Sequence, residues 1–183
     1  IPFAVGGGIG SLEDMKQIIL AGAEKVSVNS RSVQKPEIIR AGAEHFGNQC
    51  VVLGMDAARD EDMPSGYRVY INGGRTPTEL DAMEWARRAV ELGAGGIVLT
   101  SIDGDGAKEG YEIQLTRMIS EAVGVPVVAS GGAGTSAHLA EVLKEGRADA
   151  ALIASMVHID GYRIGDIKRY LAEREIPVRM DGF

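Results

Sequence analysis

Six short apolar segments alternate along the whole chain with segments that have helical periodicity. The apolar segments cover residues 1–5, 25–28, 50–55, 97–100, 126–129 and 150–153. The helical segments cover about 11–21, 35–46, 78–92, 112–123, 135–144 and 164–174. Strict alternation of strands and helices is typical of a parallel sheet wrapped by helices. We therefore predict an α/β fold with six βα units, interrupted between residues 57 and 78 by a hairpin that begins at 67–71.

An internal repeat predicts how this sheet is arranged. Residues 1–11 match residues 125–135, with the prolines, three glycines and the capping hydroxyls in register. The match continues to the next strand end, where residues 28–30 meet 153–155 after one inserted residue. Units one and two thus resemble units five and six, which indicates two halves of four units each. Eight units close into a barrel of roughly 250 residues.

We therefore expect residues 1–183 to form one partial (β/α)8 TIM-barrel domain that holds six of the eight units. The alternative is a chance similarity between two glycine-rich turns. The repeat covers both a turn and the strand end that follows it, which favours the barrel.

The repeated turns indicate phosphate binding. Gly7-Gly8 and Gly131-Gly132 each precede a helix that a hydroxyl residue can cap. Glycine leaves backbone amides unblocked, and a helix N-terminus carries positive partial charge, so both features suit an anion. Ser30 and Ser155 follow the next strands and can each add a donor. Two copies of this arrangement on one rim suggest a ligand with a phosphate at each end.

Acidic residues follow the strands that lie between the two turns. Asp56 ends the third strand, and Asp103 and Asp105 follow the fourth. Thr100, at the end of the fourth strand, adds a hydroxyl. A carboxylate at the carboxyl end of a barrel strand is a reasonable general acid or base. The alternative for Asp56 is a capping or solvated aspartate, and for Asp103 a structural role is favoured, because alternate loop residues need not all face the ligand.

Six segments, in order along the chain, resemble the cyclase subunit of imidazole glycerol phosphate synthase, an enzyme of histidine biosynthesis. They are Phe3-Ala4-Val5-Gly6-Gly7-Gly8-Ile9, Lys25-Val26-Ser27-Val28-Asn29, Met55-Asp56-Ala57, Leu99-Thr100-Ser101-Ile102-Asp103-Gly104-Asp105-Gly106, Ala129-Ser130-Gly131-Gly132-Ala133-Gly134 and Ala154-Ser155. The resemblance implies a (β/α)8 barrel of which this chain contains the third to eighth units. It also implies a lyase that takes ammonia from a glutaminase subunit in a heterodimer.

The family closes the imidazole ring of a bisphosphorylated ribulosyl substrate and releases imidazole glycerol phosphate and an aminoimidazole carboxamide ribotide. The sequence leaves two alternatives open. One is the isomerase of the preceding pathway step, which shares the two-phosphate barrel but needs no ammonia. The other is a phosphate-binding barrel fragment without catalytic activity.

The resemblance also assigns site residues. Asp56 matches a catalytic aspartate of the family. One phosphate would be held by Gly8, Asn29 and Ser30, and the other by Gly106, Gly132 and Ser155. Their neighbours Gly7, Gly131 and Ala154 are further candidates for binding substrate or phosphate. The substrate would be lined by Thr100, Asp105 and Ser130.

Lys25 begins its strand, so it should face the opposite end of the barrel. In the family, a lysine here belongs to a ring of charged residues that gates ammonia entry. The acidic member of that ring corresponds to Gly96 in this chain, so the gate departs from the family pattern. A snorkelling surface lysine is the alternative reading.

The family's other catalytic aspartate belongs to its first strand, which this sequence does not contain. We therefore expect negligible cyclase activity from this stretch alone. We also expect two exposed sheet edges, which favour self-association.

Composition restricts the remaining function classes. The net charge of -7 argues against nucleic acid or an anionic membrane as the main partner. No apolar run approaches the roughly 20 residues that span a bilayer, and the single cysteine, Cys50, fits a reducing cytoplasm. His45, His138 and His158 have no companion at ligand spacing, so we expect neither a metal nor a cofactor.

Overall fold

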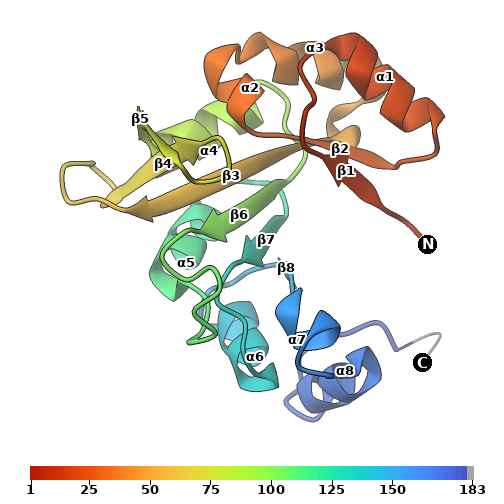
Figure 1. The fold of residues 1–183 in the computed structure, drawn as a ribbon, viewed down its shortest axis with the longest axis vertical. Coiled ribbons are helices and arrows are strands. Elements are labelled where there is room, and N and C mark those ends of the chain that lie inside the picture. The colour runs from red at the N-terminus through yellow and green to blue at the C-terminus, as the bar shows by residue number, and fades with distance from the viewer. Residues whose placement is uncertain (181–183) are drawn as a thin grey trace.

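The computed structural model, which describes residues 1–180, contains a curled parallel sheet with helices along its outer side (Figure 1). The parallel strands, in spatial order, are β1 (Ala4–Gly6), β2 (Lys25–Val28), β3 (Val51–Arg59), β6 (Ile97–Ser101), β7 (Val127–Ser130) and β8 (Ala150–Ala151). The six main helices are α1 (Leu12–Leu20), α3 (Glu37–Phe46), α4 (Ala82–Glu91), α5 (Ile113–Ala122), α6 (Ser136–Lys144) and α8 (Ile164–Ala172). This arrangement is part of a (β/α)8 barrel, which confirms the predicted fold class.

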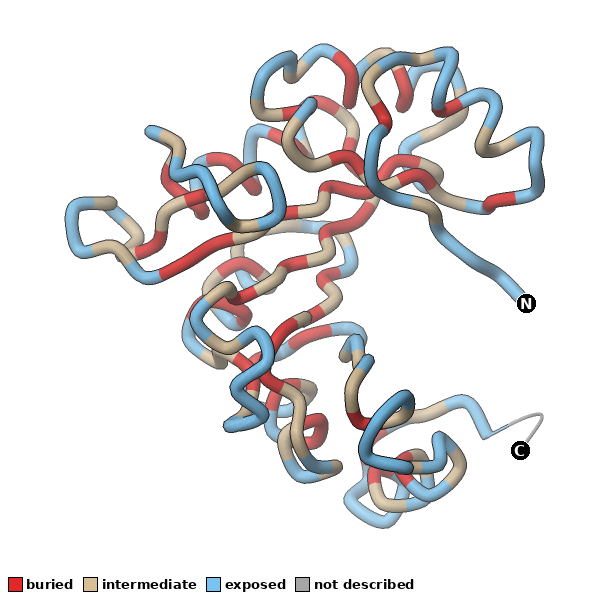
Figure 2. The backbone as a smooth tube through the Cα atoms, in the orientation of Figure 1, coloured by how far each residue is buried: buried red, intermediate tan, exposed pale blue. Residues whose placement is uncertain are grey.

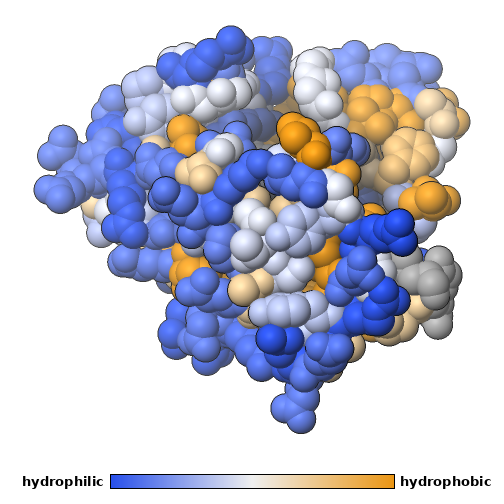
Figure 3. All heavy atoms as spheres, turned by 60° about the horizontal axis from the view of Figure 1, so that its bottom comes forward, coloured by the Kyte–Doolittle hydropathy of each residue, from blue (hydrophilic) through white to orange (hydrophobic). Residues whose placement is uncertain are grey.

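The sheet stays open within the described residues, as predicted. β1 pairs only with β2, and β8 pairs only with β7. Phe3 beside β1 and Leu152 beside β8 are large apolar residues that remain exposed. Figure 3 shows the largest group of hydrophobic residues toward the right of the view, with smaller groups elsewhere on a mainly hydrophilic surface.

The core lies between the strands and the inner faces of the helices, where Figure 2 shows most of the buried backbone. Met15 of α1, Ile39 of α3 and Trp85 of α4 are at most 2% exposed and belong to the larger of two apolar clusters. Tyr111 and Met156 belong to the second cluster, under α6 and α8. Trp85 is therefore a packing residue. Within the described part of the chain, no helix is long and apolar enough to cross a membrane.

The structure contains the predicted hairpin but extends it further than predicted. β4 (Tyr67–Ile71) runs antiparallel to β3, and β5 (Thr76–Asp81) runs antiparallel to β4. The predicted start of the following helix at about residue 78 is wrong, because α4 begins at Ala82 with Asp81 as its N-cap. The Thr78 hydroxyl instead donates to the Val69 carbonyl across the hairpin, at 2.8 Å.

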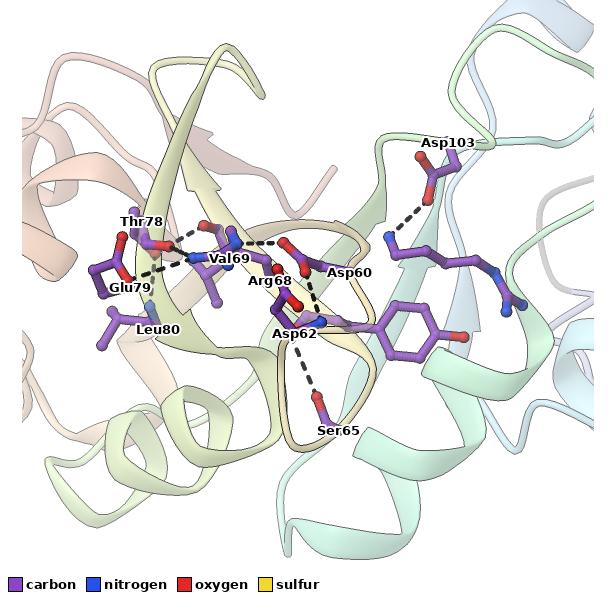
Figure 4. Close-up of polar contacts among 11 residues, drawn as sticks. Asp60, Asp62, Ser65, Arg68, Val69, Thr78, Glu79, Leu80 and Asp103 are labelled. Atoms are coloured by element: carbon purple, nitrogen blue, oxygen red, sulfur yellow. Dashed lines mark hydrogen bonds and ion pairs between the residues drawn. The ribbon is translucent and has the colours of Figure 1, made fainter.

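Polar contacts fix the base of this hairpin (Figure 4). Arg68 of β4 contacts both the loop after β3 and the strand β5: its Nε donates to Asp60 at 2.5 Å, and its Nη1 donates to the Thr78 carbonyl at 2.7 Å. This contact with Arg68 lowers the pKa of the Asp60 carboxyl. Asp103 accepts a hydrogen bond from the backbone amide of Arg59 at 2.9 Å, which ties the loop after β6 to the end of β3. Asp103 thus makes a structural contact at the end of β3.

Two short helices were not predicted. α2 (Ser30–Gln34) follows β2 directly, and α7 (Ser155–His158) follows β8. A 3₁₀ turn, η1 (Asn48–Cys50), also precedes β3. Both short helices begin at a serine that the sequence assigned to phosphate binding.

Candidate active site

Three predicted site residues lie side by side on neighbouring strands. Asp56 of β3 pairs with Thr100 of β6, and Thr100 pairs with Ser130 of β7. Each lies at or near the carboxyl end of its strand, where barrel enzymes carry their active sites. The parallel register therefore brings a carboxyl and two hydroxyls to one rim.

Asp56 is half-buried at the centre of this rim. Asn29 Nδ2 donates to its Oδ2 at 2.9 Å. Burial raises the pKa of the Asp56 carboxyl above its ordinary value, and the nearby charge of Asp105 raises it further, against hydrogen bonds from Asn29 and the Gly74 amide that lower it. A carboxyl with a raised pKa can both hold and release a proton during a reaction.

A cavity of about 620 Å³ is lined in part by Asn29, the residue that bonds to Asp56, and we call it the first cradle. Its lining includes Gly7, Gly8, Asn29 and Ser30, all of which the sequence assigned to the first phosphate. Gly7 and Gly8 have φ angles of 92° and 71°, a backbone conformation that glycine adopts readily. Across the cavity, the Asn72 amide of the β4–β5 turn donates to Ser30 Oγ at 2.8 Å, so the hairpin tip forms one wall.

A second, smaller cavity of about 60 Å³ lies at the other end of the rim, and we call it the second cradle. Its lining includes the predicted residues Asp105, Gly106, Ser130, Gly131, Gly132, Ala154 and Ser155. Gly131 and Gly132 have φ angles of 89° and 102°, so this turn repeats the conformation of the first cradle. A Cβ on Gly132 would lie 1.9 Å from the Gly110 carbonyl oxygen, which leaves room for glycine alone.

The helices beyond the two glycine turns are capped in the same way. Ser11 accepts the Asp14 amide ahead of α1, and Thr135 accepts the His138 amide ahead of α6. Asp14 and His138 bond back to the Gly10 and Gly134 amides, at 2.9 and 3.2 Å. The Gly10 and Gly134 amides are therefore already occupied, which leaves the earlier glycine amides of each turn for an anion.

Lys25 lies away from this rim, at the start of β2. Its Nζ donates to the Gln49 carbonyl at 2.6 Å. The structure thus separates Lys25 from the cradles and places it at the amino ends of the strands, as its position in the sequence predicted.

Sequence reasoning missed two cations that line the cradles. Arg31 lines the first cradle and Lys108 the second. Lys108 Nζ lies 2.7 Å from both carboxylate oxygens of Asp160, and its backbone is left-handed, with a φ of 59°. The available signal was proximity: Arg31 directly follows Ser30, and Lys108 lies two residues after Gly106.

Comparison with known proteins identifies the family. The model of a family described as "Histidine biosynthesis protein" matches residues 1–163. The subunit named "Imidazole glycerol phosphate synthase subunit HisF" from Desulforapulum autotrophicum is 61% identical over 182 residues, which cover 98% of this chain and 70% of that protein. The protein of the same name from Syntrophobacter fumaroxidans is 62% identical over 182 residues, with the same coverage. The chain belongs to the HisF family.

HisF is the cyclase subunit of imidazole glycerol phosphate synthase, so this membership confirms the family that the sequence motifs indicated. It places the chain among lyase-type enzymes of histidine biosynthesis that work as a subunit of a larger synthase. A third HisF relative, from Desulfosudis oleivorans, is 61% identical over 183 residues, which cover 71% of its length.

Proposed function

We propose that the rim binds a bisphosphorylated ribulosyl substrate with one phosphate in each cradle, and that Asp56 transfers protons at the part of the substrate between them. The observation that carries this proposal is the position of Asp56 on a rim that has a glycine cradle toward each end. Gly8, Asn29 and Ser30 then hold one phosphate, and Gly106, Gly132 and Ser155 hold the other.

Asp56 suits proton transfer because its surroundings oppose full ionisation. Burial and the Asp105 charge favour the protonated carboxyl, while Asn29 favours the carboxylate by donating to it. Thr100 and Ser130, aligned with Asp56 across the strands, supply hydroxyls that orient the middle of the substrate. Closing an imidazole ring requires protons to be removed from some nitrogen and oxygen atoms and added to others. A carboxyl of this kind can transfer those protons.

The nitrogen of the new ring comes, on this proposal, from ammonia that a glutaminase partner delivers at the amino ends of the strands. Lys25 lies at that end, and its contact with the Gln49 carbonyl keeps its charge beside the entrance. Gly96 supplies no carboxylate there, so the entrance is built without that charge. The single cysteine is consistent with work in the cytoplasm.

The test is ammonia-dependent formation of imidazole glycerol phosphate by the full-length enzyme. We expect Asp56→Asn to lower kcat by at least about a hundredfold, the usual contribution of one general acid or base, with a smaller change in KM. Asp103→Asn is the matched control, because its carboxylate contacts the Arg59 amide. Turnover of the isomerase substrate without ammonia, or an equal loss in both variants, would contradict the proposal.

A further inference from the structure

Arg31 presents an unused cationic group to the first cradle. It lies in α2, immediately after Ser30, and its Nε donates to the Gly10 carbonyl at 3.2 Å. Its two terminal amino groups make no hydrogen bond or ion pair with any other described residue. The contact with Gly10 thus places the guanidinium beside the glycine turn while leaving donors available.

The charge of the first cradle depends on this one side chain. Among the described residues that line the cavity, Arg31 is the only charged one; the others are glycines, apolar residues, and neutral serine, asparagine and glutamine side chains. The nearest acid of the turn, Asp14, is not a lining residue and bonds to the Gly10 amide. An anion in this cradle therefore meets a positive group and no carboxylate on the wall.

Arg31 has no cationic counterpart in the other copy of the internal repeat. Arg31 follows Asn29-Ser30, and the matching position after Ala154-Ser155 is Met156, which is fully buried. The second cradle has a different cation, Lys108, whose ammonium is already bonded to Asp160. The two cradles thus have similar glycine turns but different charge environments.

We propose that Arg31 is a phosphate-binding residue of the first cradle, which donates its free terminal amino groups to the phosphate and makes this cradle the tighter of the two. This inference rests on the proposed function, because it requires that the cradle hold a phosphate. A guanidinium suits the role because its planar donor pair matches two phosphate oxygens. Its bond to Gly10 reduces the ordering needed when the phosphate arrives.

Titration of the full-length protein with inorganic phosphate, followed by NMR, tests the inference. The Gly8 and Gly132 amides report on the first and second cradles separately. We expect Arg31→Gln to weaken phosphate binding seen at Gly8 by about tenfold, the loss of one charge-assisted contact, and to leave binding at Gly132 unchanged. Arg31→Lys should recover part of the loss, because lysine keeps the positive charge but lacks the planar donor pair of the guanidinium.

Arg75→Gln is the matched control. Arg75 lies in the β4–β5 turn near the same cavity and bonds through Nε to the Asn72 carbonyl at 2.8 Å, yet it does not line the cradle. We expect this variant to change binding at Gly8 by less than about twofold, the effect of a screened surface charge.

Three results would overturn the inference. Equal binding at Gly8 in Arg31→Gln and the unchanged protein would remove Arg31 from the site but leave the proposed function standing. Equal losses in Arg31→Gln and Arg75→Gln would show a general charge effect instead of a contact. No response to phosphate at either glycine in the unchanged protein would contradict both the inference and the proposed function.

Discussion

The chemistry proposed for the rim depends most on the surroundings of one carboxyl. Asp56 is half-buried, bonded to Asn29, and close enough to Asp105 for the two charges to interact. Each neighbour acts on the pKa of Asp56 in a known direction. Substitutions at these neighbours therefore have effects of known sign.

We predict that Asp105→Asn lowers the pKa of Asp56, because it removes a nearby negative charge that disfavours ionisation. The acidic limb of the pH dependence of kcat/KM should move to lower pH with it. Carboxyl ¹³C NMR titration of Asp56 measures the shift directly. Asp103→Asn, in the same loop, should leave the titration in place; a rise in the pKa of Asp56 in Asp105→Asn would refute this account of its surroundings.

Matching glycines of the repeat should tolerate a side chain differently. Gly8 has a φ of 71°, and a Cβ added there would have no atom within 4 Å, so Gly8→Ala should cost about 1 kcal/mol of unfolding free energy from backbone strain. Gly132 adds a clash, since its Cβ would lie 1.9 Å from the Gly110 oxygen, and Gly132→Ala should cost about 3 kcal/mol. Urea unfolding measures both, and equal costs would show that the second turn is looser than described.

At the element scale, the hairpin and α4 meet at a single buried carboxylate. Asp81 ends β5, caps α4 by accepting the Met83 and Glu84 amides, and accepts the Ser65 amide at 2.7 Å. Burial alone would raise the pKa of Asp81, but these hydrogen bonds outweigh it, and its pKa is lowered. The stabilisation is therefore present above the unfolded-state pKa and is lost as pH falls through the lower folded-state pKa.

We predict that Asp81→Ala lowers the unfolding free energy at neutral pH by about 2 kcal/mol, from the lost cap and the unpaired Ser65 amide. The difference from the unchanged protein should shrink in acid. Asp81→Asn, which keeps a capping oxygen, should lose less. A loss below about 0.5 kcal/mol for Asp81→Ala, measured by urea unfolding, would show that Asp81 does not fix this junction.

The length of an element decided whether its pattern could be recognised in the sequence. Long periodic helices and apolar strands were recognisable, because each repeats its pattern over several residues. α2 and α7 have five and four residues, too few for a helical period to appear. Thr78 and Asp81 are both good capping residues, and the choice between them depended on Val69 across the hairpin, a contact that local sequence does not contain.

The candidate site, too, could be predicted only in part from the sequence. Glycine turns and strand-end residues could be placed on one rim from the repeat and the family resemblance, and the structure brings them to two cavities, one toward each end of the rim that carries Asp56. Arg31 and Lys108 could not be placed, because a cation near a turn points equally well to solvent. Their positions depend on bonds to Gly10 and Asp160, which lie 21 and 52 residues away in the chain.

At the scale of the whole molecule, the curled sheet arranges two cradles along one rim with Asp56 between them. We propose that these cradles hold the two ends of one ligand. Independent anion sites on the same rim would have the same glycine turns, so binding stoichiometry distinguishes the two arrangements.

The most direct measurement is calorimetric titration of the full-length protein with the bisphosphorylated ribulosyl substrate, without ammonia. We predict one substrate per chain, displaced by inorganic phosphate, and weaker binding when either Gly8 or Gly132 is replaced by alanine. Two substrates per chain, or binding that only one of these replacements weakens, would contradict the claim that one ligand spans both cradles.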